Sequence, residues 1–223
     1  MQLCIMVHQI QYYFGVHVWS DKYMLFVVGL GPGHEDYIIK KAENVLKSSD
    51  AIIGFKRAID SLNFIDNKKI YLKSLKDLEK ILEENKKINI SLVASGDPMF
   101  YGIVNYLNNN ITYDFEVIPG ISSFQYLASK VKLPWNNAHL GSLHGRNEEF
   151  INTVKENNMT VWLTDKENNP SKLCEILYSK IIDCNVIIGE NLSYEDEIIN
   201  IGKPEEFINK QFSELSILII SRE

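Results

Sequence analysis

Residues 25–33 read Leu25-Phe26-Val27-Val28-Gly29-Leu30-Gly31-Pro32-Gly33, an apolar run typical of a buried strand that leads directly into a glycine turn. Apolar residues then recur at helical spacing from Ile38 to Leu46. A strand, a glycine turn and a helix form a place where backbone N–H groups can approach an anionic or nucleotide-like ligand. The glycines are nevertheless too closely spaced for a dinucleotide fingerprint, and Pro32 removes one N–H donor. We therefore expect a ligand other than a nicotinamide cofactor at this turn.

The overall composition is that of an ordinary globular chain. Of its 223 residues, 45% are hydrophobic and 23% are charged, and the formal net charge is −6. This acidic balance argues against nucleic acid or an anionic membrane surface as a partner. The three cysteines, Cys4, Cys174 and Cys184, are odd in number and include no close pair. That pattern argues against a disulfide framework and against a thiolate metal site, so we expect a cytoplasmic protein without a metal centre.

The chain divides into three parts. Residues 1–23 lack both the basic start of a signal peptide and the uninterrupted apolar length of a membrane span. We assign this segment no function, and two accounts of it stay open: it is an upstream extension, or Met24 is the natural start of the protein. Strand-like and helix-like patterns alternate over residues 24–133, which predicts an α/β domain with a mainly parallel sheet. Strands follow one another closely over residues 138–223, which predicts a second α/β domain with a partly antiparallel sheet and an active-site cleft between the two domains.

The individual strands are predicted from short apolar runs. They are expected at Leu25–Val28, Ala51–Ile53, Ile88–Ala94, Phe115–Ile118, Ala138–Ser142, Thr160–Leu163, Val186–Gly189, Ile198–Ile201 and Leu215–Ser221.

Three turns of the first domain share one design, in which an apolar strand ends in small or special residues before a helix. They are Gly29–Gly33, Ser95–Tyr101 and Pro119–Ser123. The carboxyl ends of parallel strands share one edge of the sheet, and ligands collect at that edge. Asp97 has two interpretations: it caps the following helix, or it holds a hydroxyl or ammonium group of a bound cofactor. The two serines of the third turn have the same two interpretations.

In order and in separation, these turns resemble the successive motifs of the tetrapyrrole methylases, which methylate corrin and porphyrin precursors with S-adenosylmethionine. The resemblance runs from Met24 to the end of the chain. Two further segments, Leu143-His144-Gly145-Arg146 and Gly189–Glu197, are similar to the branch that methylates C5 of a cobalt-precorrin in cobalamin biosynthesis. The resemblance implies a C-methyltransferase that uses S-adenosylmethionine, takes a cobalt-precorrin as substrate and forms a homodimer.

The resemblance also implies the positions of the two ligands. The cofactor contacts would come from the second and third turns and from two later strands: Gly96, Asp97, Phe100, Ser122, Ser123, Leu163 and Gly189. The first turn would face the macrocycle through Gly29, Gly31, Pro32 and Gly33. A precorrin carries acetate and propionate groups, so its site needs cations. Arg57 and Arg146 each follow a predicted strand and are the candidates, with a surface charge as the alternative for each.

The reaction requires few catalytic side chains. Methyl transfer from a sulfonium is an in-line displacement, for which alignment of donor and acceptor can supply most of the rate. The conjugated macrocycle carbon attacks, so the enzyme needs no nucleophilic side chain. A base would then take the proton from C5. His144 is the first candidate because imidazole titrates near neutrality, and Glu190 is the second. A structural contact or a contact with a substrate carboxylate is the alternative for His144.

Other functions remain open at this point. Within the family, the methyl group could go to another ring position, or to a diphthamide or ribosomal RNA target. A dinucleotide-binding oxidoreductase would need a third glycine five residues after the first and an acidic residue at the end of the next strand. Gly33 comes too early for that, and Asp50 precedes its strand instead of ending it. A binding module that has kept the fold without catalysis is a further alternative.

Overall fold

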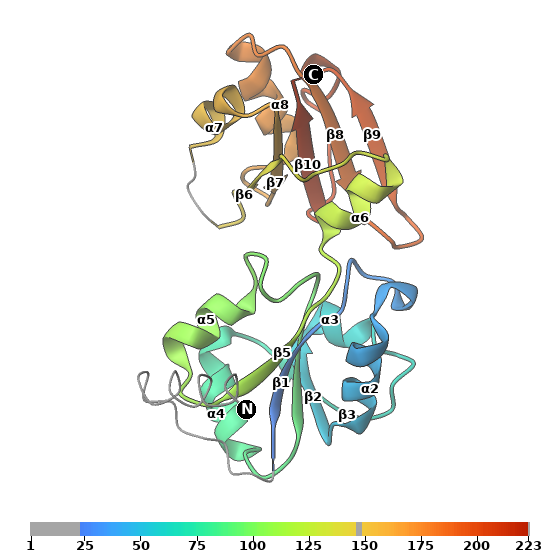
Figure 1. Cartoon of the computed structure of the whole chain (residues 1–223), viewed down its shortest axis with the longest axis vertical. Helices are drawn as coiled ribbons and strands as arrows, with labels where there is room; N and C mark the ends of the chain where they lie inside the picture. Colours follow the sequence, from blue (N-terminus) through green and yellow to red (C-terminus); the bar gives the residue numbers. More distant parts are fainter. Residues whose placement is uncertain (1–22, 146–148, 223) are drawn as a thin grey trace, which may run out of the picture. The chain divides into compact units, whose positions relative to one another are not determined.

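The structure, a computed structural model, describes residues 23–145 and 149–222. The extension up to residue 22, which includes Cys4, and the candidate Arg146 lie outside the described residues. Contacts divide the chain into two compact units, Met1–Ile121 and Ser122–Glu223 (Figure 1). No helix within the described residues is long and apolar enough to cross a membrane.

The first unit is built on a five-stranded sheet in the order β3-β2-β4-β1-β5, and every neighbouring pair is parallel. The strands are β1 (Leu25–Gly29), β2 (Ala51–Phe55), β3 (Lys68–Leu72), β4 (Ile90–Ala94) and β5 (Phe115–Ile118). The helices between them are η1 (Glu35–Tyr37), α2 (Lys40–Ser48), α3 (Lys56–Asp60), η2 (Leu75–Asp77), α4 (Leu78–Glu84) and α5 (Ile103–Asn110). Because all five strands run the same way, their carboxyl ends lie along one edge of the sheet.

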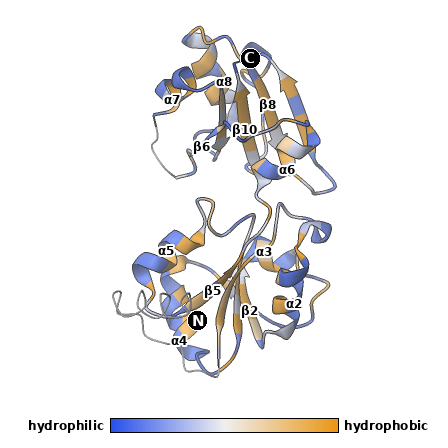
Figure 2. Ribbon diagram, in the orientation of Figure 1, coloured by the Kyte–Doolittle hydropathy of each residue, from blue (hydrophilic) through white to orange (hydrophobic). Residues whose placement is uncertain are grey.

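Both faces of this sheet are buried under helices, as parallel sheets require. On one face Val28 and Ile52 pack with α2 and α3, and on the other Val27 and Ile53 pack with α4 and α5. Figure 2 shows the apolar colouring concentrated on the strands and the polar colouring on the outer helix faces. Alternate residues of one strand therefore serve two separate cores.

The second unit contains a mixed five-stranded sheet in the order β6-β7-β10-β8-β9. The strands are β6 (His139–Ser142), β7 (Met159–Leu163), β8 (Asn185–Glu190), β9 (Ile198–Gly202) and β10 (Ser216–Ser221). The helices are α6 (Ser123–Lys130), α7 (Phe150–Glu156), α8 (Pro170–Ser179) and η3 (Pro204–Glu206). Only β6 and β7 pair in parallel, and the other neighbours are antiparallel. Trp162 is fully buried where α7 and α8 cover this sheet.

The predicted pair of α/β folds, one parallel and one mixed, is confirmed, with two differences in detail. Strand β3 was not predicted. Helix α6 belongs to the second unit, because the units divide between Ile121 and Ser122. The sequence places the boundary later, at residues 134–137, where a proline and two asparagines interrupt the pattern. The cleft that the sequence analysis expects stays a prediction.

Candidate functional site

The carboxyl edge of the parallel sheet carries the three predicted turns, and their glycines bring the backbones into direct contact. A Cβ atom at Gly29 would lie 2.6 Å from the amide nitrogen of Gly120 and 2.8 Å from the carbonyl oxygen of Gly96. A Cβ atom at Gly120 would lie 2.9 Å from Gly29 Cα and would overlap the Gly96 carbonyl oxygen. Since all of these neighbours are backbone atoms, only glycine fits at positions 29 and 120.

The first turn is fastened to the second by an isolated bridge. The amide of Gly31 donates to the carbonyl of Gly96 at 3.2 Å, and the amide of Gly96 donates to the carbonyl of Gly31 at 2.7 Å. Gly31 has φ +77°, and a Cβ atom there would lie 2.8 Å from the carbonyl oxygen of Tyr37. Pro32 and Gly33 follow half-buried at the surface of the turn. The turn is therefore a rigid backbone surface whose central amide is already bonded.

The second turn centres on Asp97, which joins the second turn to the third. Its Oδ1 accepts the amide of Met99 at 2.7 Å, and its Oδ2 accepts the amide of Gly120 at 3.3 Å. The interpretation of Asp97 as a helix cap is wrong, because α5 begins only at Ile103 with Gly102 as its N-cap residue. Asp97 instead shapes the turn, and a carboxylate with two accepted bonds still has lone pairs for a ligand. Met99 beside it is 64% exposed, and the ring of Phe100 packs edge-on against Tyr101. Tyr101 has φ 51°, a strained value for an aromatic residue.

Arg57 lies at the same edge, in the first turn of α3 directly after β2. Its Nη2 donates to Ser95 Oγ at a long 3.4 Å, where Ser95 is the residue after β4. No carboxylate among residues 23–145 and 149–222 forms an ion pair with this exposed guanidinium. By contrast, neighbouring Lys56 is paired with Asp60 at 2.5 Å. Arg57 can therefore receive an anionic group from outside the chain.

The third turn ends in the cap of α6. Ser122 is 3% exposed, its amide donates to Gln125 Oε1 at 2.9 Å, and its hydroxyl donates to the same oxygen at 3.1 Å. This is the capping interpretation of Ser122, worth about 1 kcal/mol to such a helix. Ser123 is the first residue of α6 and is half-buried.

In the second unit, the candidate residues lie along one edge of the mixed sheet. The pairing register aligns Ser142, Leu163, Ile217, Gly189 and Ile199 in a single row across the sheet. Since β8 runs parallel in direction to β6 and β7, the carboxyl ends of these three strands share that edge. A Cβ atom at Gly189 would meet the side chains of Leu192 and Leu127, which fill this position. The register thus brings Leu163 and Gly189 to one edge, two strands apart.

His144 emerges at this edge, two residues beyond the end of β6, and its ring is oriented. Nδ1 lies 3.0 Å from the carbonyl oxygen of Thr164. A carbonyl only accepts, so Nδ1 carries the hydrogen and Nε2 keeps its lone pair in the neutral ring. The next amide, Gly145 N–H, donates to Asp165 Oδ2 at 2.8 Å. Hydrogen bonds from the amides of Asn168 and Gly145 lower the pKa of Asp165 below its ordinary value.

Glu190, the second candidate base, is placed differently. It ends β8, is 7% exposed, and both carboxylate oxygens are engaged. Oε1 accepts the side-chain amide of Asn200 at 3.2 Å, and Oε2 accepts the backbone amide of Ser213 at 2.8 Å. Ser213 Oγ in turn donates to Asn191 Oδ1 at 2.6 Å. Glu190 thus ties β8 to β9 and to the segment before β10, which is a structural role.

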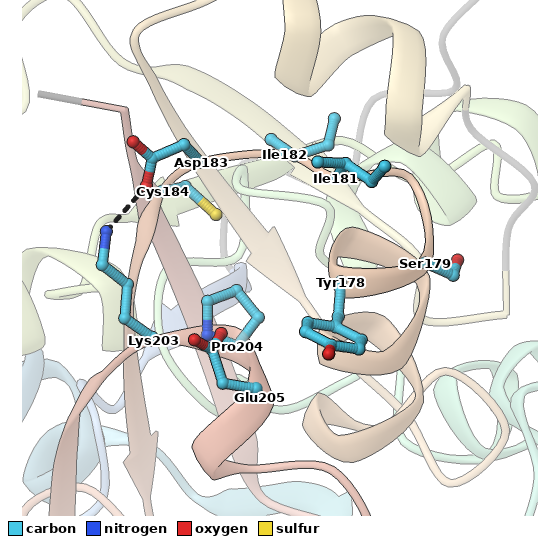
Figure 3. A pocket seen from close by; sticks show the side chains of 9 residues that line it. All are labelled: Tyr178, Ser179, Ile181, Ile182, Asp183, Cys184, Lys203, Pro204 and Glu205. Atoms are coloured by element: carbon cyan, nitrogen blue, oxygen red, sulfur yellow. Dashed lines mark hydrogen bonds and ion pairs between the residues drawn. The ribbon is translucent and has the colours of Figure 1, made fainter.

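A surface hollow of about 540 Å³ lies at the opposite end of β8 (Figure 3). Lys203 and Asp183 form an ion pair of 2.8 Å at its rim, and Cys184 lies beneath it. Burial raises the pKa of the Cys184 thiol, and it raises the pKa of the Cys174 thiol to about 12. None of the predicted site residues lines this hollow. Over residues 23–145 and 149–222, no group of three or more His, Cys, Asp or Glu side chains could hold a metal ion.

Sequence reasoning missed the residues that hold the candidates in place. Ser95 supports Arg57, and the pair Thr164 and Asp165 supports the segment of His144. Thr164 and Asp165 come directly after β7, so the strand-end pattern used for the first domain could have found them. Ser213 gave no such signal, because it contacts Glu190 from 23 residues away.

Comparison with known proteins gives a consistent result. Residues 24–208 match the tetrapyrrole (corrin/porphyrin) methylases. The chain is 33% identical, over 88% of its length and 97% of the relative, to a probable cobalt-precorrin-7 C(5)-methyltransferase of Methanocaldococcus jannaschii. It also resembles the crystal structure of a precorrin-6Y methylase from Archaeoglobus fulgidus, with a TM-score of 0.72, 21% identity and coverage of 90% and 98%.

A second solved structure adds a bound ligand. It is a uroporphyrin-III C-methyltransferase from Thermus thermophilus in complex with S-adenosylhomocysteine, with a TM-score of 0.72 and 20% identity. The match covers 89% of this chain and 97% of that one. At such identity the likeness concerns the fold, whereas the sequence matches extend over most of the chain. The chain belongs to the tetrapyrrole methylase family.

Proposed function

We propose that the protein transfers a methyl group from S-adenosylmethionine to C5 of a cobalt-precorrin, a step in cobalamin biosynthesis. One observation carries the proposal: the sequence match to the cobalt-precorrin-7 methyltransferase spans 97% of that relative, so it includes both units. By the same resemblance, the protein works in the cytoplasm as a homodimer. The closest alternative is methylation at another ring position or of another target.

The residues of the parallel sheet's edge fit the cofactor. When bound, S-adenosylmethionine supplies an electrophilic methyl group on a sulfonium centre, and its hydroxyl and ammonium groups need acceptors. The Asp97 carboxylate is fixed by the amides of Met99 and Gly120 and keeps lone pairs for such donors. Apolar surface from Met99 and the Phe100 ring lies beside it for the adenine. The S-adenosylhomocysteine bound to the Thermus thermophilus relative supports this choice of cofactor.

The other cofactor contacts are assigned by motif. In this proposal they are the backbone of Gly96, Ser122 and Ser123 at the unit boundary, and Leu163 and Gly189 in the row of the mixed sheet. Ser122 contributes as a hydrogen-bond acceptor, because its backbone amide and its hydroxyl hydrogen are both already bonded to Gln125. Gly189 contributes through its backbone, because leucine side chains fill the position of a side chain there.

Two features serve the substrate. The turn Gly29–Gly33 presents a flat backbone surface to the macrocycle, since the bridge from Gly31 to Gly96 holds it rigid. Arg57 binds one peripheral carboxylate of the precorrin, because it has no acidic partner among the described residues and a guanidinium pairs well with a carboxylate. Arg146 would be the second carboxylate-binding cation in this proposal.

His144 takes the proton from C5 after the methyl group has arrived. The hydrogen bond from Nδ1 to the Thr164 carbonyl leaves the Nε2 lone pair as the proton acceptor. The bond between the Gly145 amide and Asp165 fixes the segment that carries the ring. Glu190 is not assigned the role of base here, because both of its oxygens are occupied within the protein.

The test is a reaction with defined components. Purified protein, S-adenosylmethionine and cobalt-precorrin-7 should give a product one methyl group heavier, with the new carbon located at C5 by NMR with a 13C-labelled methyl donor. A label at another ring carbon would replace the C5 assignment with the family alternative. Binding of the cofactor by calorimetry without any turnover of authentic substrate would contradict the enzymatic proposal and favour a binding module.

A further inference from the structure

Tyr101 has a backbone conformation that its side chain does not favour. Three large side chains within the described residues have a positive φ: Lys132 at 55°, Ile181 at 54° and Tyr101 at 51°. In this left-handed region the Cβ atom of an L-residue comes too close to the following carbonyl oxygen, so glycine or asparagine is the usual occupant. Each of the three positions therefore needs a local explanation.

Helix ends explain two of the three positions. Lys132 directly follows the C-cap residue of α6, and the next amide donates to the Ala128 carbonyl at 2.9 Å. Ile181 directly follows the C-cap residue of α8, and the next amide donates to the Leu177 carbonyl at 3.1 Å. A left-handed residue with this hydrogen bond is a common way to end a helix. Tyr101 is different, because it lies in the second turn, between β4 and the start of α5.

The second turn closes on itself around Tyr101. The Val104 amide donates to the Pro98 carbonyl at 3.2 Å, and a Cβ atom at Gly102 would lie 2.9 Å from Pro98 Cα. The chain thus returns against Pro98 directly after Tyr101, which fixes the left-handed conformation there. Glycine would adopt this conformation without strain. The closure of the turn therefore does not account for a tyrosine at this position.

The Tyr101 side chain packs against the ring of Phe100. The ring centroids lie 5.1 Å apart and the ring planes are inclined by 78°, and both side chains are half-buried. A nearly perpendicular aromatic pair is stabilising beyond the area that it buries. It also restrains both rings, and a ring that is restrained before a ligand arrives loses less conformational entropy on binding. Phe100 lies three residues after Asp97, in the turn proposed to bind the cofactor.

We propose that Tyr101 is a positioning residue for the cofactor: its ring holds the Phe100 ring in the orientation that packs against the adenine of S-adenosylmethionine. The inference rests on the proposed function, which assigns the adenine to the apolar surface of Met99 and Phe100. It adds a residue that acts through its neighbour. Strained backbone of this kind occurs preferentially at ligand sites, where it places a side chain that the site uses.

The test compares substitutions at two left-handed positions. Tyr101→Asn removes the ring, and asparagine tolerates the left-handed backbone, so the turn should stay folded. The dissociation constant for S-adenosylmethionine, measured by calorimetry, should rise about 5-fold, the equivalent of one aromatic pair. Tyr101→Phe keeps the ring and should stay within about 2-fold of the wild type. Ile181→Asn is the matched control, because Ile181 is 92% exposed beside the hollow of Figure 3, and it should bind the cofactor as the wild type does.

A double-mutant cycle tests whether Tyr101 acts through Phe100. In a Phe100→Ala background, Tyr101→Asn should change the dissociation constant by less than about 2-fold, because the ring that Tyr101 holds is gone. Independent effects of the two substitutions, unchanged binding by Tyr101→Asn, or binding by Tyr101→Phe as weak as that of Tyr101→Asn would each overturn this inference and leave the proposed function standing. A wild-type protein that does not bind S-adenosylmethionine would overturn both.

Discussion

The two sheets present their carboxyl edges in different ways. In the parallel sheet, the turns after β1, β4 and β5 touch through glycine backbones, with Gly29 and Gly120 packed atom against atom. In the mixed sheet, the segments after β6, β7 and β8 are held by side chains such as Asp165 and Glu190, each accepting hydrogen bonds from two partners. The first edge is a fixed backbone surface, and the second is a set of separate polar ties.

This difference determines what a substitution can report. At the carboxyl edge of the parallel sheet, here called the glycine edge, an added methyl group must displace backbone atoms. Such a substitution lowers the stability of the fold whether or not a ligand binds there. At the carboxyl edge of the mixed sheet, here called the polar edge, one hydrogen bond can be removed while the sheet stays folded. Functional roles are therefore best tested at the polar edge and at Asp97 and Arg57, whose side chains project from the glycine edge.

The largest expected effect is on turnover, at the polar edge. His144→Gln should lower the rate of methyl transfer about 100- to 10,000-fold, the usual contribution of a positioned general base. The affinity for S-adenosylmethionine, measured by calorimetry, should stay unchanged. His139→Gln, at the start of the strand β6 that precedes His144, is the control and should retain activity. A fully active His144→Gln enzyme would leave this histidine with a structural role only.

Next in size is the cost of a methyl group at the glycine edge. Gly120→Ala should lower the free energy of unfolding by about 3 kcal/mol, because its Cβ would overlap backbone that cannot move aside. Gly189→Ala in the mixed sheet should cost only about 1 kcal/mol, since its neighbours are leucine side chains that can repack. Urea unfolding of both variants measures the contrast. Equal losses would remove the distinction between the two edges.

A smaller effect is expected from Glu190→Gln. The amide keeps the shape of the side chain but replaces one acceptor by a donor, so the bonds from Asn200 and Ser213 cannot both remain. The expected loss is about 1–2 kcal/mol of stability, with turnover per folded molecule near that of the wild type. A collapse of turnover without a loss of stability would restore Glu190 as a candidate base.

The smallest effect depends on pH. The folded-state pKa of Asp165 lies below its ordinary value of 3.8, so its two hydrogen bonds contribute fully above that pH and are lost as the pH falls through the folded-state pKa. Asp165→Asn should therefore be slightly less stable than the wild type near neutrality, by under about 1 kcal/mol. The difference should shrink in acid. Denaturation at a series of pH values measures it, and a difference that grows in acid would have the wrong sign.

Much of this fold could be predicted from the sequence because buried parallel strands are short apolar runs. Strands β1, β2, β4 and β5 were found in this way. Strand β3 was missed because it is an edge strand that begins Lys68-Lys69 and buries only its last residue, Leu72. The domain boundary was placed late because apolar spacing shows that α6 has a buried face without showing which sheet it covers.

The site was only partly predictable. The three turns were found, because each follows a readable strand. Their mutual contacts were not, since the fit of Gly120 against Gly29 joins residues far apart in the chain and leaves no local pattern. The different roles of Glu190 and His144 could not be predicted, for the same reason. A strand end predicts where each residue lies, but only tertiary partners decide that one carboxylate is fully bonded and one imidazole nitrogen is left to accept a proton.

The bridge between Gly31 and Gly96 also affects the binding selectivity of these turns. The amides of Gly31 and Gly96 both donate within the chain, so the first and second turns offer neither of them to a phosphate group. Nucleotides that depend on a pyrophosphate cradle lose the contacts that such turns provide in dinucleotide-binding proteins. A ligand that brings hydroxyl and ammonium donors does not need those amides, and the proposed acceptor for its donors is the carboxylate of Asp97. Discrimination against common nucleotides can thus arise from donors that the loop keeps for itself.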